Sequence, residues 1–74
     1  MNPFKIGDVV RFKRNWKQII EDNSYGYNVE RLIRIKDKDL KVERISENMV
    51  HTTPNENYRF YYNMLEYAKE ENEI

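Results

Sequence analysis

The segment formed by residues 4–13 constrains the fold most, because a strand pattern follows a turn signal within it. Val10 and Phe12 are two residues apart and therefore face the same side of an extended chain, whereas Arg11 faces the opposite side, toward solvent. Gly7 and Asp8 precede this alternation and are typical of a turn or a bulge. We therefore predict that the domain begins with a half-buried β-strand.

The size of the chain limits how the fold is stabilised. Seventy-four residues are enough for one domain, and a domain of this size buries only about 60% of its unfolded surface. The chain has no cysteine, which excludes disulfides and cysteine-based zinc or iron–sulfur sites. Stability must come from the apolar core or from a partner chain.

Three further strands are predicted from short β-forming runs that are separated by turn residues. Residues 40–46 and 49–53 flank Glu47 and Asn48, which suit a hairpin turn. Residues 58–62 form an alternating aromatic run after a turn at 54–57. One face of this last run consists of Tyr58, Phe60 and Tyr62, and the other of Arg59 and Tyr61.

One helix is predicted over residues 15–22. Trp16, Ile19 and Ile20 recur at the spacing of one helix face, and Asn15 is an acceptable N-cap. The composition of residues 23–28 is typical of a loop, in which Gly26 is free to take a positive φ.

The remaining segments are less regular. Residues 29–36 suit a helix end or a strand, and we favour a strand at the end of this stretch, closed by a turn at 36–39. Residues 63–68 are expected to form a single helical or 3₁₀ turn that brings Met64 and Leu65 onto the core. We predict one domain over residues 1–68 and a flexible acidic tail over 69–74.

About five short strands with one helical insertion after the first indicate a mainly β fold, a small barrel or sandwich. The pattern F-x-x-G-D-x-V that starts at Phe4 resembles the first strand of SH3-like β-barrels. The whole of residues 4–67 resembles small SH3-like barrel proteins of phages and prophages, which end in an aromatic strand followed by M-L-E, here Met64 to Glu66. This resemblance implies an SH3-like barrel and an origin in a mobile element, but no reaction.

The sequence argues against an enzyme. A general acid or base needs a positioned partner, and the single histidine, His51, follows Val50 in a predicted strand, where it is expected to face solvent or a sheet edge. No phosphate-binding, dinucleotide-binding or zinc-protease motif is present. Asp37 and Asp39 lack the remaining ligands of a calcium loop. We therefore predict no catalytic residue, no cofactor and no metal site.

A basic and aromatic cluster is the main candidate for a binding surface. It comprises Arg11, Lys13, Arg14, Trp16 and Lys17, and Tyr25, Tyr27 and Tyr61 would extend it. Cations bind phosphates and exposed aromatic rings stack on bases, so nucleic acid is one predicted ligand. A formal net charge of zero argues against it, because dedicated nucleic-acid-binding domains are usually basic.

A host protein is the partner that we favour from the sequence, because tyrosine and tryptophan are common interface anchors and SH3-like barrels expose strand edges. The acidic residues Glu66, Glu70, Glu71 and Glu73 are a second candidate surface, either for a basic partner or in mimicry of nucleic acid. Self-association as a homodimer is a third alternative to a monomer. No signal peptide or membrane span is evident, so we expect a cytoplasmic protein without a membrane partner.

Overall fold

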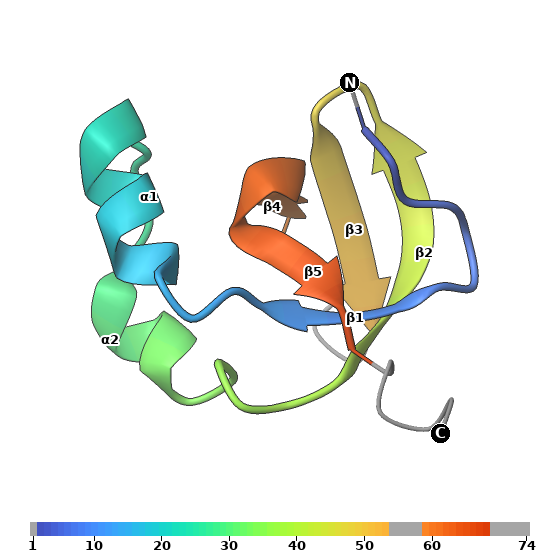
Figure 1. Cartoon of the computed structure of the whole chain (residues 1–74), viewed down its shortest axis with the longest axis horizontal. Helices are drawn as coiled ribbons and strands as arrows, with labels where there is room; N and C mark the ends of the chain where they lie inside the picture. Colours follow the sequence, from blue (N-terminus) through green and yellow to red (C-terminus); the bar gives the residue numbers. More distant parts are fainter. Residues whose placement is uncertain (1, 54–58, 69–74) are drawn as a thin grey trace.

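The computed structural model describes residues 2–53 and 59–68. Figure 1 shows the two α-helices together at one side of a β-sheet. The elements in chain order are β1 (Val9–Phe12), α1 (Trp16–Asn23), α2 (Val29–Ile33), β2 (Leu40–Ser46), β3 (Met49–Thr53), β4 (Arg59–Tyr61), the 3₁₀ helix η1 (Tyr62–Met64) and β5 (Leu65–Tyr67).

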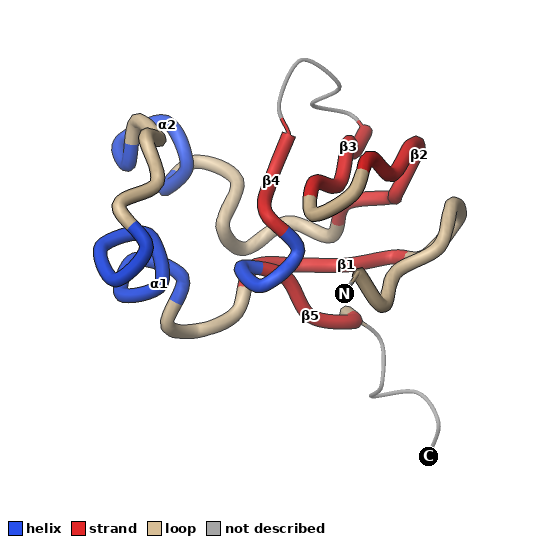
Figure 2. Tube along the Cα trace, turned by 90° about the horizontal axis from the view of Figure 1, so that it is seen from above, coloured by secondary structure: helices blue, strands red, loops and turns tan. Residues whose placement is uncertain are grey.

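The five strands form one antiparallel sheet in the order β4-β3-β2-β1-β5. The last strand therefore returns to pair with the first, and Figure 2 shows β5 running beside β1. The prediction of a mainly β fold with about five strands is confirmed. Within the described residues β4 and β5 do not pair with each other, so the sheet is not closed into a barrel.

The core lies on the inner face of the sheet and is closed by aromatic side chains. Val10 and Phe12 are buried, as the alternation in β1 predicted. The ring of Phe12 lies between those of Phe60 and Trp16, at centroid distances of 5.1 and 5.4 Å. Burying one large apolar side chain contributes about 1.5–3 kcal/mol to the stability of the fold. These three rings therefore hold β1, β4 and α1 together in a chain that has no disulfide.

Helix α1 confirms the helix predicted over residues 15–22. Trp16 and Ile20 are buried and Ile19 packs against the core. The apolar face predicted for this helix is therefore the face that packs against the core at one end of the sheet. Asn15 occupies the N-cap position, but its side chain accepts no hydrogen bond from the helix. Ser24 ends the helix in the left-handed conformation, with φ of 57°.

The strand favoured at the end of residues 29–36 is absent, because residues 34–37 form turns, and the helix that this stretch also suited is present as α2. The Asn28 side chain accepts hydrogen bonds from the backbone N–H groups of Glu30 and Arg31, at 3.1 and 3.4 Å. This cap satisfies two N–H groups that a helix start otherwise leaves unpaired, which favours helix over strand from Val29 onward. Leu32 and Ile35 then reach the core from a helical turn instead of a strand.

A β-bulge interrupts β2 and changes the direction of its side chains. Val42 pairs with Thr52 and Arg44 pairs with His51, so Glu43 is an extra residue without a partner on β3. Simple alternation after Val42 would turn Arg44 inward and Ile45 outward. The bulge reverses this, because Arg44 is exposed and Ile45 packs against the core.

The end of the described chain is partly helical and partly a strand. The single helical or 3₁₀ turn predicted at 63–68 is present as the 3₁₀ helix η1, whereas Leu65–Tyr67 forms the strand β5. Leu65 pairs with Phe12 in register, and the two side chains are buried together. Pairing with β1 therefore draws this segment into the sheet, while Met64 and Leu65 still reach the core as predicted.

Candidate functional site

The basic and aromatic cluster predicted from the sequence does not form a flat stacking surface. Trp16 is only 5% exposed and packs against Phe12, so its ring is not a platform for a base. Lys17 extends over the same indole, with its Nζ 5.8 Å from the ring centroid. The tryptophan therefore belongs mainly to the core, and the cations around it are what remains at the surface.

The predicted basic and acidic surfaces meet each other at the β1–β5 pair. Arg11 and Glu66 are partners in register, and 2.9 Å separates the guanidinium Nε from the carboxylate Oε2. Glu66 is thus part of a strand and of an ion pair, not of an acidic tail. The other predicted acidic residues, Glu70, Glu71 and Glu73, lie outside the described residues.

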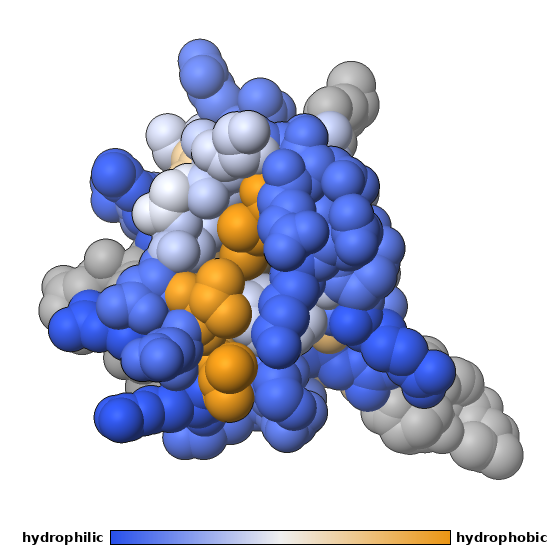
Figure 3. All heavy atoms as spheres, turned by 90° about the vertical axis from the view of Figure 1, so that its left-hand side faces the viewer, coloured by the Kyte–Doolittle hydropathy of each residue, from blue (hydrophilic) through white to orange (hydrophobic). Residues whose placement is uncertain are grey.

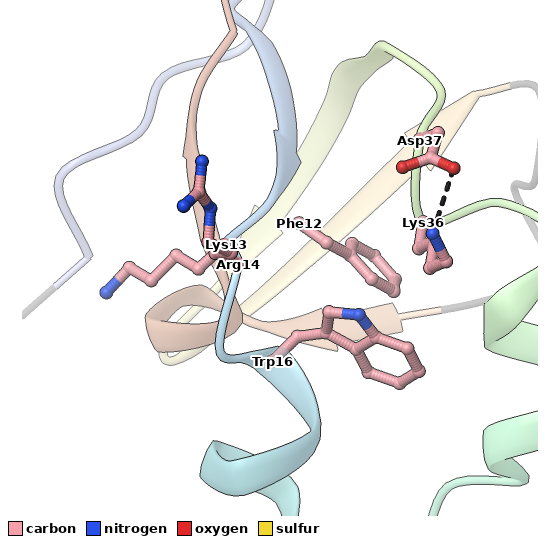
Figure 4. Close-up of a pocket in the computed structure, with 6 residues that line it drawn as sticks. All are labelled: Phe12, Lys13, Arg14, Trp16, Lys36 and Asp37. Carbon is pink, nitrogen blue, oxygen red and sulfur yellow. Dashed lines mark hydrogen bonds and ion pairs between the residues drawn. The ribbon is translucent and has the colours of Figure 1, made fainter.

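A hollow beside β1 has Lys13 and Arg14 of the predicted cluster in its lining, but not Lys17. It lies where the β1–α1 connection faces the turn after α2, and one part of it has a volume of about 130 Å³. This part is lined by Phe12, Lys13, Arg14, Trp16, Lys36 and Asp37 (Figure 4). Lys36 and Asp37 were assigned to a turn from the sequence, and the helical fold of residues 29–33 is what carries them to this position.

The three predicted tyrosines form one cluster between the α1–α2 loop and β4. The rings of Tyr25 and Tyr61 stack with a centroid distance of 3.7 Å and an interplanar angle of 5°. Tyr27 meets both rings edge-on, and its hydroxyl donates a 2.6 Å hydrogen bond to the backbone carbonyl of Arg59. Burial raises the pKa of the Tyr27 hydroxyl to about 12. The cluster thus fixes the loop onto β4 and leaves Tyr61 half-buried at the sheet surface.

A row of basic side chains next to this cluster was missed in the sequence. Arg44, His51 and Arg59 are direct neighbours in register across β2, β3 and β4. All three belong to the outer face of the sheet, opposite the buried Val50 and Phe60. The signal was present in the spacing of Val42 and Ile45, which are three residues apart instead of two and thus indicate the bulge that exposes Arg44.

The electrostatics of this row centre on His51. Its Nδ1 lies 3.4 Å from the Arg44 Nη2, and because a guanidinium only donates, the imidazole accepts there and is neutral. Partial burial, followed by the charges of Arg44 and Arg59, lowers the pKa of His51 below its usual 6.5. With His51 neutral, the row carries the two positive charges of Arg44 and Arg59, and an anion bound beside them would be stabilising.

The helical side of the molecule carries apolar surface. Figure 3 shows a strip of hydrophobic atoms on this side, bordered by hydrophilic ones. Among apolar side chains of the two helices, Ile33 is 42% exposed, and Ile19 and Val29 are only partly buried. None of the described helices is long and apolar enough to cross a membrane, and the described Asp, Glu and His side chains form no group of three that would suit a metal ion.

Comparison of the chain with protein-family models, with curated proteins and with solved structures gave no match.

Proposed function

We propose that this chain is a non-enzymatic binding module with an SH3-like arrangement of strands. Two features support the SH3-like assignment: the F-x-x-G-D-x-V opening, and a meander whose fifth strand returns to the first after a single 3₁₀ turn. The phage or prophage origin implied by the resemblance stays a prediction.

We propose single-stranded nucleic acid as the ligand, bound on the outer face of β2, β3 and β4. The observation that carries this is the in-register row of Arg44, His51 and Arg59. Neighbouring strands lie about 4.8 Å apart, so the row extends over roughly 10 Å and suits a phosphate backbone lying across the strands.

The tyrosine cluster supplies the second element of such a site. Tyr61 is two residues from Arg59 and pairs with Met49, so it shares the outer face with the basic row. Because its ring is already held against Tyr25, it would lose little conformational freedom when a base packs beside it. A base stacked on an aromatic side chain contributes about 1–3 kcal/mol, which makes a combined site stronger than the charges alone.

Fluorescence anisotropy with labelled single-stranded DNA and RNA, from about 50 to 200 mM salt, tests the proposal. For single strands, each lost phosphate contact makes the negative slope of log K against log salt shallower by about 0.7. We expect the Arg44→Gln/Arg59→Gln variant to bind more weakly at every salt concentration, with a slope of log K against log salt that is shallower by about 1.4. Arg34→Gln, which removes an exposed charge from the turn after α2, is the matched control.

Two results would contradict the proposal. One is the absence of any binding at the lowest salt concentration. The other is an equal effect of the double variant and of Arg34→Gln, because the attraction would then depend on total charge and not on the row.

A protein partner is the second candidate, and the apolar strip on the helical side supports it. Ile33, which is 42% exposed, is the most exposed apolar residue of α2. Pull-down from a host lysate with the wild-type protein and with Ile33→Asp tests this surface. Loss of a captured protein in Ile33→Asp supports a protein partner there, whereas equal capture contradicts it. Sedimentation of both proteins distinguishes capture of a host protein from self-association.

A further inference from the structure

His51 lies between two arginines on the outer face of the sheet. Arg44 is its partner in register on β2, and Arg59 is its partner on β4. Neither arginine forms an ion pair within the part of the chain that the structure describes. The imidazole is therefore placed between two cations whose charge no described carboxylate neutralises.

Three other ionisable side chains belong to the two strands that flank His51. Lys41 and the bulged Glu43 are exposed on β2, and Tyr61 lies on the outer face of β4. Glu43 is the only carboxylate within the bounds of β2, β3 and β4. Among the ionisable groups of these strands, an imidazole alone ordinarily changes its charge between about pH 5 and pH 8. His51 is thus the one group through which a change of pH in this range alters the charge of the basic row.

The contact between Arg44 and His51 determines where the neutral imidazole holds its proton. The Arg44 Nη2 lies 3.4 Å from Nδ1 and can only donate, so the neutral ring carries its proton on Nε2. Nε2 forms no hydrogen bond within residues 2–53 and 59–68, and the side chain is partly exposed. The N–H at Nε2 is therefore a donor that a ligand on the outer face can use.

A second proton on the ring is unfavourable unless an anion is present. A protonated Nδ1 and the Arg44 guanidinium are both donors, and the ring would add a third charge beside those of the two arginines. Partial burial, followed by the charges of Arg44 and Arg59, already lowers the pKa of His51. A phosphate oxygen beside the ring accepts hydrogen bonds from the guanidinium and from the imidazolium together. Its negative charge removes the repulsion and favours the protonated ring.

We propose that His51 couples proton uptake to the binding of a phosphate backbone, so that the basic row binds single-stranded nucleic acid more tightly as the pH falls below neutrality. This inference rests on the function proposed for the row and adds a regulation to it. The direction follows from linkage, because a ligand that raises the pKa of a group binds more tightly when that group is protonated. Neutral His51 offers the ligand one donor, whereas protonated His51 offers a donor and a full positive charge.

Fluorescence anisotropy with a labelled oligo(dT) strand at pH 7.5 and pH 5.5, at one salt concentration, measures the coupling. Thymine bases and phosphodiester groups keep their charge in this range, so a change in affinity reports on the protein. A tenfold difference in affinity corresponds to about one pKa unit, and we expect the wild type to bind about fivefold more tightly at pH 5.5. The slope of log K against log salt is expected to be steeper by about 0.7 at pH 5.5, because a third cation then contacts the backbone.

Two substitutions of His51 have opposite expected effects. His51→Gln keeps a donor but gains no charge, so we expect binding as weak as that of the wild type at pH 7.5, and the same at both pH values. His51→Arg is charged at both pH values, so we expect it to bind at pH 7.5 about as tightly as the wild type does at pH 5.5. Arg34→Gln is the control and keeps the pH dependence of the wild type. A pH dependence in His51→Gln as large as that of the wild type overturns the proposal.

A direct measurement of the His51 pKa needs no variant. His51 is the only histidine of the chain, so its imidazole gives a single set of NMR signals in the full-length protein without a histidine tag. Titration of these signals with and without saturating oligo(dT) gives the pKa of His51 in the complex and in the free protein. We expect the pKa to be higher in the complex. An unchanged or lower pKa in the complex contradicts the coupling.

The outcomes separate this proposal from the function on which it rests. The absence of oligo(dT) binding at both pH values contradicts the nucleic-acid site, and the coupling with it. Binding that is weakened in Arg44→Gln/Arg59→Gln but is equally strong at pH 7.5 and pH 5.5 supports the site and contradicts the coupling alone.

Discussion

Arg44 and His51 lie directly opposite each other on β2 and β3, with the guanidinium Nη2 3.4 Å from the imidazole Nδ1. This contact exists because the bulge at Glu43 turns Arg44 outward, onto the face that His51 already occupies. It favours the neutral form of the imidazole, since a positive charge on His51 would be a third one, beside those of Arg44 and Arg59.

The contact predicts how stability depends on pH. The folded-state pKa of His51 is lowered, so the unfolded chain binds the proton more readily than the folded one. Stability due to the neutral imidazole is therefore present above about pH 6.5 and is lost as the pH falls below that value toward the folded-state pKa. We expect urea unfolding at pH 7.5 and 5.5 to show a larger loss of stability for the wild type than for His51→Gln. Equal losses in the two proteins would show that His51 does not contribute.

The hydroxyl of Tyr27 is predicted to hold the α1–α2 loop onto the edge strand β4. Its hydrogen bond to the Arg59 carbonyl is 2.6 Å long, and burial raises the pKa of the hydroxyl to about 12. We expect Tyr27→Phe to lower the free energy of unfolding by about 1 kcal/mol. Tyr67→Phe is the control, because the Tyr67 hydroxyl also bonds to a carbonyl, that of Pro3, but from a side chain that is 48% exposed. A loss in Tyr67→Phe as large as in Tyr27→Phe would argue against this role.

Thr52 is predicted to be a position where a more apolar residue stabilises the fold. Its side chain is fully buried on β3, and its Oγ1 has no hydrogen-bond partner among the described residues. Replacing an unsatisfied hydroxyl by a methyl group of similar size removes the desolvation cost. We expect Thr52→Val to raise the free energy of unfolding by about 1 kcal/mol, measured by urea denaturation, and Thr53→Val on the outer face to change it by less than about 0.5 kcal/mol. A destabilised Thr52→Val would mean that the hydroxyl has an acceptor.

The two glycines of the chain are predicted to differ sharply when replaced by alanine. Gly7 has φ of 99°, which side chains rarely adopt, and its N–H donates to Val42 across the sheet at 2.9 Å. Gly26, for which the sequence suggested a positive φ, does not adopt one, and an added Cβ meets nothing within 4 Å at either position. We expect thermal unfolding to show a loss of about 1–3 kcal/mol for Gly7→Ala and no loss for Gly26→Ala. Similar effects at the two positions would contradict the backbone explanation.

Most of the strand pattern was readable from the sequence because it depends on near neighbours. The alternation at Val10 and Phe12 and the hairpin between β2 and β3 follow from residues that are two to four positions apart. Helix α1 follows in the same way from Trp16, Ile19 and Ile20. The errors fell where such local signals compete. At residues 29–33 the Asn28 cap favours a helix. At Leu65, pairing with Phe12, which is more than fifty residues away in the chain, favours a strand.

The candidate sites depended on the fold to a greater degree. Of the predicted cluster, the fold buried Trp16 and paired Arg11 with Glu66, which left Lys13 and Arg14 beside a hollow. It also aligned Arg44, His51 and Arg59, which are seven or more positions apart in the chain.

The sequence by itself determined the class of fold, the faces of the strands and the types of side chain that would reach the surface, because these follow from periodicity and composition. Only the tertiary structure decided which charges cancel and which stand together. Strand register and a single bulge set the distances between charged groups, and electrostatic interactions depend on those distances and not on positions in the chain.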